Sequence, residues 1–389
     1  MNLRVAILSL IMSVAAATAI AQSGRPPSET EVREALRSLD HELTRRTHYI
    51  GLRQQRIDSL LHECRNAAPA TAPYEALAQA YAGFNNDSAM ACLRRAEEVS
   101  DGIRLQRLRL HLASLLPLAG MFESAQKVFA EIDTTQLTTS ADRHLYSEHG
   151  RQMYSYLSAF FDRNPQLSAH FKEQALDMQQ HLLRELPEDS DERLFNEGEY
   201  AFLTGHDTRA AAILTELLSH PALSDILRAR ATHHLSSIAK SRGDEAGRIV
   251  YLAQSAMADL RSATREVASL QELGSTLSAH GDIDRAYAYL SAALTGAVEC
   301  GAEMRMLESA RSLPYIEQAY ARKTARAQTI TIWIAIVMAM LVFVLIGMLA
   351  VLRRDMRKMR LLQDGLRSAN RTKELYMKQF LTLFSIYME

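Results

Sequence analysis

Apolar residues recur every three or four positions along most of this 389-residue chain, which is the period of amphipathic helices. Short turns interrupt the pattern, and each is centred on a Gly or an Asn. The turn residues are Gly83, Gly120, Asn164, Gly205, Gly243 and Gly281. Neighbouring turns lie 37 to 44 residues apart, the length of a helix, a turn and a second helix. The sequence therefore predicts an array of helical hairpins over residues 67–320, not one globular core.

The last unit resembles the tetratricopeptide repeat, in which large apolar residues of the first helix alternate with a small one where the second helix crosses closely. The matching residues are Leu270, Leu273, Gly274, Leu277, Gly281, Asp282, Ala286, Leu290 and Ala293. Two earlier units share these offsets, at Leu194, Gly198, Gly205, Ala210 and Leu214, and at Leu112, Ala113, Leu116, Gly120, Ala125 and Phe129. We therefore expect tetratricopeptide-like packing, with a generic array of helical hairpins as the alternative.

Three units fit this pattern less well. Ser88 and Arg248 stand where the second helix should carry a small residue, so we expect a shifted register in both units. Pro165 directly follows the turn residue Asn164, which predicts an irregular or lengthened connection there.

Stacked pairs of this kind form a right-handed superhelix whose concave face is lined by the first helices. Such a face typically binds a peptide or another protein. The candidate partner-binding residues on it are Glu192, Phe195 and Glu199 in one unit, and Gln271, Ser275 and Ser278 in the last.

Residues 22–66 precede the array and predict one long polar helix or a hairpin, because an apolar stripe runs from Glu31 to Asn66. The stripe consists of Leu36, Leu39, Leu43, Ile50, Ile57, Leu60 and Leu61. Since a terminal repeat needs one polar side, we expect this segment to be a helical cap on the first repeat.

The two ends of the chain predict a membrane protein. Residues 1–21 combine Arg4, an apolar stretch and a small-residue exit before Gln22, as in a cleaved signal peptide; a retained membrane anchor is the alternative. Residues 329–352 carry an uncharged run, Ile330 to Leu352, of the length that crosses a bilayer. Export would place the array in the periplasm and leave a single-pass protein in the bacterial inner membrane.

The remaining residues, 353–389, predict a cytoplasmic helix with a coiled-coil-like seam in alternating steps of three and four. The seam consists of Met359, Leu362, Leu366, Ala369, Lys373, Tyr376, Phe380, Leu383 and Tyr387. A homodimer through this helix is one interpretation, and packing on a missing domain is the other. Because the sequence stops at Glu389 in mid-helix, we expect a truncated chain or one that has lost its output domain.

Composition adds mainly exclusions. The net charge is −1, so we expect no contact with nucleic acid by this chain. Scarce Gly and Pro favour a nearly all-helical protein. Three scattered cysteines, Cys64, Cys92 and Cys300, predict free thiols, with a Cys64–Cys92 pair as the alternative if their helices stack. None of the 13 histidines has the neighbours of a metal or catalytic motif, so we expect no enzyme, cofactor or metal. An aromatic cluster around Tyr154 predicts core between repeats, with a pocket as the alternative.

Three segments resemble a family of Bacteroidetes membrane regulators that carry a domain of unknown function. The first runs from Leu39-Asp40 to Leu60, the second from Tyr251 to Tyr287, and the third from Ala369 to Phe380. The resemblance implies a membrane-anchored tetratricopeptide-repeat regulator whose cytoplasmic part continues to a helix-turn-helix-like segment. That output segment is missing here, so no residue of this chain takes a DNA-binding role.

Two functions fit these expectations. In the first, the periplasmic array binds a protein or peptide partner and signals through one transmembrane helix towards transcriptional control. In the second, the chain is a structural scaffold that tethers an envelope protein complex.

Overall fold

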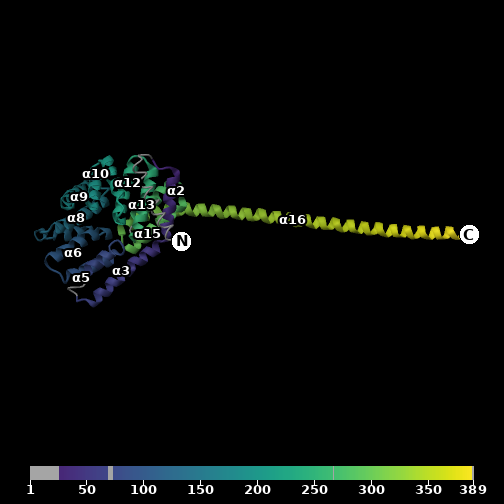
Figure 1. The fold of residues 1–389 in the computed structure, drawn as a ribbon, viewed down its shortest axis with the longest axis horizontal. Helices are drawn as coiled ribbons and strands as arrows, with labels where there is room; N and C mark the ends of the chain where they lie inside the picture. Colours follow the sequence, from purple (N-terminus) through teal and green to yellow (C-terminus); the bar gives the residue numbers. More distant parts are fainter. Residues whose placement is uncertain (1–25, 69–72, 266, 388–389) are drawn as a thin grey trace. The chain divides into compact units, whose positions relative to one another are not determined.

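The computed structural model describes residues 26–68, 73–265 and 267–387, and these residues fold into helices, turns and loops. Contacts divide the chain into two units, Met1–Ala319 and Tyr320–Glu389. The first unit begins with α2 (Glu29–Thr44) and α3 (Arg46–Asn66), and the helical pairs of the array follow (Figure 1). The pairs are α4 (Tyr74–Tyr81) with α5 (Asn86–Glu97), α6 (Gly102–Leu115) with α7 (Phe122–Ala130), α8 (Ser140–Phe160) with α9 (Pro165–Glu185), α10 (Asp191–Leu203) with α11 (Asp207–Leu218), α12 (Asp225–Ser241) with α13 (Glu245–Arg261), and α14 (Ala268–Ala279) with α15 (Ile283–Cys300).

Every predicted turn residue lies between the two helices of a pair, so the predicted all-α array of stacked helical hairpins is confirmed. Gly205 and Gly281 have φ of 81° and 84°, a left-handed conformation that glycine adopts without steric cost. The predicted close crossings are also present. A Cβ added to Gly198 would lie 2.7 Å from Leu214 Cδ2, and one on Gly274 would lie 2.7 Å from Leu290 Cγ.

The three weaker units differ from one another. Helix α5 begins three residues after Gly83, whereas α15 begins two residues after Gly281, so the first pair is shifted by one residue. The fully buried Ala89 then takes the place of Ser88 as the small residue, which confirms the shift. Helix α13 also begins two residues after its turn glycine, so its start is not shifted.

The predicted lengthening of the connection in the Asn164 unit amounts to one residue, because four residues join its helices and three join those of each of the last three pairs. Pro165 is the first residue of α9, where its missing N–H would have no partner within the helix. The Asn164 side chain accepts a hydrogen bond from the backbone N–H of Leu167 and caps the helix. The helices themselves are also longer, with 21 residues each in α8 and α9.

The aromatic cluster near Tyr154 is core, as predicted. Met153 is fully buried, and the rings of Tyr146 and Tyr154 lie 4.9 and 5.7 Å from that of Phe129 on α7. These rings therefore join the second pair to the third.

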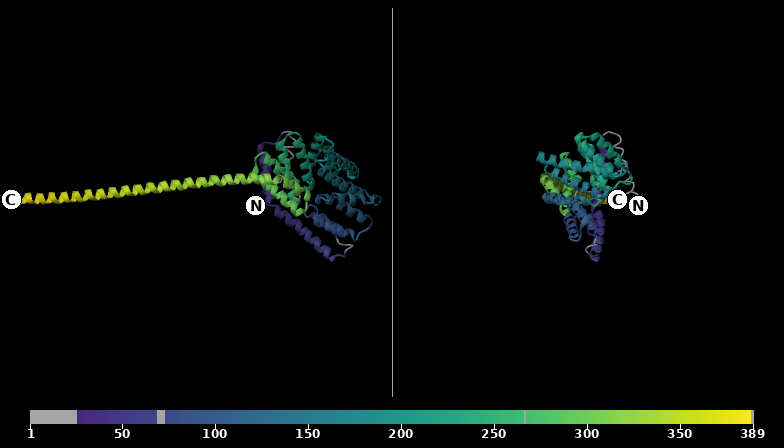
Figure 2. Two further views of the ribbon diagram at one scale, coloured as in Figure 1. Left: turned by 180° about the vertical axis from the view of Figure 1, so that it is seen from behind. Right: turned by 90° about the vertical axis from the view of Figure 1, so that its left-hand side faces the viewer.

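Helices α2 and α3 are joined by Arg45 alone, and they cover both ends of the array. Helix α3 packs against α4 of the first pair, as a cap should, but α2 packs against α13 near the other end. Leu36 and Leu39 share a buried core with residues of α13, α14 and α15. Asp40 accepts a hydrogen bond of 2.6 Å from the hydroxyl of Tyr289 and pairs with Arg285 at 3.0 Å. The array is therefore closed on itself, with the purple N-terminal helices beside the green last pair in Figure 2.

Helix α16 (Glu303–Tyr387) begins in the first unit, where Ile316 is buried in the same core. Its later residues make up the described part of the second unit. It contains an 18-residue window of mean hydropathy 3.1, so the described residues include one helix long and apolar enough to cross a membrane. The predicted signal peptide lies outside the described residues.

Candidate functional site

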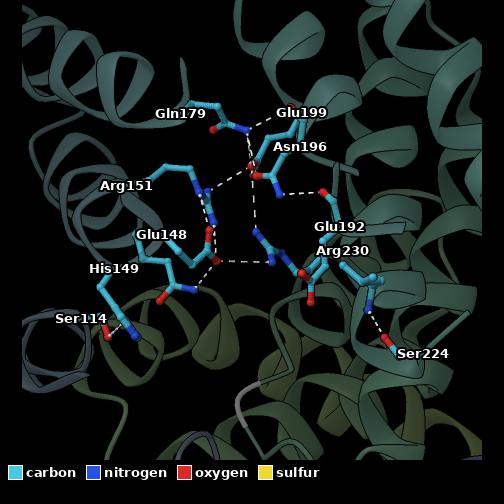
Figure 3. A network of polar contacts seen from close by, with 12 residues as sticks. Ser114, Glu148, His149, Arg151, Gln179, Glu192, Asn196, Glu199, Ser224 and Arg230 are labelled. Carbon is cyan, nitrogen blue, oxygen red and sulfur yellow. Dashed lines mark hydrogen bonds and ion pairs between the residues drawn. The ribbon is translucent and has the colours of Figure 1, made fainter. Parts of the chain in front are cut away.

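Charged side chains connect the first helices of the third, fourth and fifth pairs (Figure 3). We call this group the charge network and define it as Glu148 and Arg151 on α8, Glu199 on α10, and Arg230 and His234 on α12. Few ionisable side chains are this strongly buried unless they are paired. The network therefore brings five ionisable side chains from three repeats together.

Arg151 is the centre of the network, and only 4% of its side chain is exposed. Its guanidinium donates hydrogen bonds of 3.0 and 3.2 Å to the carboxylate of Glu148, one turn earlier on the same helix. Its Nη1 lies 3.0 Å from Oε2 of Glu199 on the next pair. One guanidinium therefore bridges two carboxylates and joins two repeats.

Glu199 receives further donors from both sides. His234 on α12 lies 3.1 Å from Oε1, and the buried side-chain amide of Gln179 on α9 donates to Oε2 at 3.0 Å. The same amide donates to the backbone carbonyl of Asn196 at 3.0 Å. Four helices thus meet at a single carboxylate, which explains how a glutamate 6% exposed is kept inside the array.

Arg230 forms the most exposed edge of the network, with 32% of its side chain accessible. It lies 3.8 Å from Glu148 and 3.9 Å from Glu199, distances that are ion pairs but too long for direct hydrogen bonds. Its guanidinium carbon stands 4.2 Å from the ring centroid of Phe195 and covers that ring. A ligand reaching the network would meet Arg230 first.

The carboxylates stay ionised in these surroundings. Burial raises the pKa of Glu148, but the charges of Arg151 and Arg230 outweigh it and hold the pKa at about 2. Burial likewise raises the pKa of Glu199, yet Arg151 and the hydrogen bond from His234 hold it well below the usual range. The network is therefore a set of opposite charges that stabilise one another.

Two histidine branches extend from this centre. His149 contacts the Ser114 hydroxyl at 2.8 Å, and its ring lies 4.4 Å from that of His111 on α6. Burial and the neighbouring His111 lower the pKa of His149 to about 3. In the other direction, His233 lies 3.1 Å from Glu272 on α14. The polar contacts therefore run across the first helices from α6 to α14.

His233 and His234 are adjacent in sequence but reach carboxylates on different helices, as expected for neighbours about 100° apart on a helix. Among the residues that the structure describes, no group of three or more His, Cys, Asp or Glu side chains could hold a metal ion. The three cysteines are free thiols, Cys64 and Cys300 buried and Cys92 partly buried.

The predicted partner-binding residues separate by burial. Glu192 and Ser275 are exposed, Gln271 and Ser278 are half-buried, and Ser275 donates to the backbone carbonyl of Gln271. Phe195 has no exposed area, so it cannot contact a partner in this conformation. Glu199 is buried in the charge network, where it binds other repeats.

Sequence reasoning missed Glu148, Arg151, Arg230 and His234. The available signal was Glu148 followed three residues later by Arg151 on a helix that also carries core residues, a spacing that places both on one face. Their partners on α10 and α12 lie dozens of residues away, so no local spacing identifies them.

A model of the SusR N-terminal TPR domain matches residues 43–311, more than half of the chain. The chain belongs to this family. The expected resemblance to a family of Bacteroidetes regulators is thus confirmed over the matched residues. The SusR N-terminal TPR domain is a regulatory repeat domain and not a catalytic family. The match includes the whole charge network and ends within α16. No curated protein matches the chain.

Proposed function

We propose that this chain is a SusR-type regulator anchored in the bacterial inner membrane. In this proposal, the repeat array binds a protein or peptide partner and signals through one transmembrane helix towards transcriptional control. The observation that carries the proposal is the family match over residues 43–311, followed in the same chain by a helix apolar enough to span a bilayer. The family match supports the regulatory role, and the apolar helix would carry the signal across the membrane.

The proposed topology places the array in the periplasm and residues 353–389 in the cytoplasm. Its support is the signal-peptide pattern of residues 1–21 and the uncharged run within residues 329–352. Trp333 is 63% exposed and the side chains around it are similarly open, as expected for a surface that faces lipid.

The proposed partner presents polar groups to the first helices of the array. Arg230 offers a partly exposed guanidinium beside two carboxylates, and Glu192 and Ser275 lie at the surface. An interface of this composition favours hydrogen-bonded, charged contacts over an apolar anchor. Arg230→Ala should therefore weaken partner binding while Arg151 continues to hold the repeats together.

The cytoplasmic part is proposed to dimerise through the apolar stripe formed by its heptad positions. Leu362, Leu366 and Phe380 are each at least 64% exposed, and an isolated helix with such a stripe is stabilised by a second copy. Cross-linking of Leu366→Cys in membranes should give a dimer, whereas the neighbouring Arg367→Cys should cross-link poorly. Equal cross-linking at both positions would contradict dimerisation through these heptad positions.

The decisive experiment compares three forms of the full chain expressed in the native host. Deleting residues 43–311 should abolish the response of the controlled transcripts, which RNA sequencing identifies. Replacing residues 329–389 with an unrelated membrane anchor should abolish it as well. If the anchor-swapped protein kept full function, the chain would act as an envelope scaffold and the regulatory proposal would fail.

A further inference from the structure

The closed array has one contact region between its first and last repeats that differs from the packing elsewhere, and we call it the seam. Its first side consists of Arg46, Arg53, Gly83, Phe84 and Asp87, and its second side of Arg265, Gly296, Glu299, Gly301 and Glu303. The backbone N–H of Arg265 donates to the carbonyl oxygen of Gly83 at 2.9 Å, across more than 180 residues of sequence. A turn of the first pair is thus bonded to the connection between α13 and α14.

Two arginines hold this contact from opposite sides. The Arg53 guanidinium donates to the carbonyls of Ala80 and Ala82 in the first pair and, at 3.1 Å, to that of Ser262 beyond α13. The ring of Phe84 lies 5.6 Å from the Arg53 guanidinium and 3.8 Å from that of Arg265. These hydrogen bonds and cation–π contacts fix the position of the turn.

The ion pairs at the seam are long and partly exposed. Arg46 and Arg265 lie 3.5 and 3.6 Å from the same carboxylate, that of Glu299, which is 43% exposed. Burial and the positive charge of Arg265 lower the pKa of Arg46, whereas the charge of Glu299 raises it. Two guanidiniums thus share one half-exposed carboxylate. Because these pairs are long and screened by solvent, this closure is weaker than the paired charge network.

Helix α16 begins inside the seam. Gly301 ends α15 with φ of 71°, and a Cβ there would lie 3.3 Å from Oδ2 of Asp87 on α5. A Cβ on Gly120, in the turn of the second pair, would lie 3.2 Å from Oε2 of Glu303. Met306 packs on a small buried cluster next to this junction. The first turns of α16 therefore contact the second and the last repeats, and the residue Gly301 just before them lies against the first repeat.

We propose that the seam is the element that passes a change in the shape of the array to α16. Opening the contact between the first and last repeats frees the Glu303 end of α16 from the turn at Gly120, and closing it holds that end in place. The proposal rests on the regulatory function above for its biological use, but the mechanical link between seam and α16 does not depend on which partner binds. A helix whose first turns contact two parts of a closable array moves when those parts separate.

The test is hydrogen exchange on the full chain in lipid nanodiscs, which needs no ligand. Glu299→Lys removes the carboxylate shared by Arg46 and Arg265 and adds a fourth cation. It should accelerate exchange by about fivefold in residues 83–87 and, to a similar extent, in residues 303–316. The charge-swapped double variant Glu299→Lys/Arg46→Glu should restore slow exchange. The control Glu185→Lys disrupts an ion pair with Arg143 on α8, far from the seam in sequence, and should leave both segments unchanged.

A second variant disrupts the seam by steric overlap and leaves its charges unchanged. A Cβ on Gly296 would approach the carbonyl oxygen of Arg265 at far below contact distance, so Gly296→Ala should push the seam apart and reproduce the effect of Glu299→Lys. Faster exchange in residues 83–87 with unchanged exchange in 303–316 would overturn the proposal. Unchanged exchange in both segments of both variants would overturn it too. These outcomes leave the regulatory function standing, since that function is tested by transcript levels.

Discussion

The charge network and the seam both join repeats through arginine, but they surround it differently. In the network, Arg151 contacts two carboxylates at 3.0 Å, and a second cation lies beside them. At the seam, Arg46 and Arg265 share one half-exposed carboxylate at 3.5 to 3.6 Å, and Arg53 donates to backbone carbonyls. Short, buried ion pairs make the middle of the array a rigid join. Longer and more exposed ion pairs leave the closure as the place where the array opens at least cost.

The largest expected effect is the loss of Arg151. Arg151→Met would leave the buried Glu199 and the half-buried Glu148 with Arg230 as their only remaining arginine, so we expect a loss of about 3–5 kcal/mol in the free energy of unfolding. Denaturant unfolding of the full chain in detergent, followed by circular dichroism, measures it. The control Arg143→Met breaks a pair whose arginine is 49% exposed and should cost far less, because solvent screens such a pair. Equal losses in the two variants would remove the distinction between the network and an ordinary surface pair.

Lowering the pH should reduce the free energy of unfolding in two stages, first through His149 and then through Glu148. His149 has a pKa lowered to about 3, so between pH 6.5 and 3 the unfolded chain binds a proton that the folded chain does not. Stability should fall with decreasing pH over this window, by up to about 1 kcal/mol per unit. Below pH 4.5, Glu148 adds a second loss, because its pKa of about 2 makes its stabilisation disappear as the pH falls towards 2. His149→Gln should flatten the slope between pH 6.5 and 4.5, and an unchanged slope would refute the assignment.

The next largest loss of stability is expected where the two helices of a pair cross closely. Gly198→Ala places a Cβ 2.7 Å from Leu214 and should destabilise the array by about 1–3 kcal/mol. Gly51→Ala is the matched control, since Gly51 lies within α3 with nothing within 4 Å of a Cβ. It should stabilise the protein by about 0.5–1 kcal/mol through the lower entropy of the unfolded chain. Thermal unfolding of the two variants should therefore shift in opposite directions.

The smallest effect is expected at the seam. Glu299→Gln should lower the free energy of unfolding by no more than about 1 kcal/mol, because the carboxylate is half-exposed and solvent screens its pairs. The same denaturant experiment compares it directly with Arg151→Met. If Glu299→Gln proved as damaging as Arg151→Met, the seam would be a rigid join, and the contrast between the two regions would disappear.

The turn residues show how much of the fold could be predicted from the local sequence. Gly205 and Gly281 mark left-handed turns between apolar helices, and Gly198 and Gly274 mark close crossings, so helical pairs could be predicted from spacing alone. The apolar run of α16 is equally local, because its length and lack of charge need no partner to be recognised. The one-residue shift at Ala89 was signalled by Ser88 in the expected small position.

Only the tertiary structure decided which distant pairs meet. Leu36 and Leu39 read as a stripe that could cap the first repeat, but packing places them against α13 to α15, because a closed array buries that stripe from both ends. Phe195 and Glu199 lie on a first helix, yet both are buried, because Arg151 and Arg230 reach them from other repeats. Helical periodicity determines which residues share a face, whereas the charges and side chains that face them come from other repeats and depend on how the whole array closes.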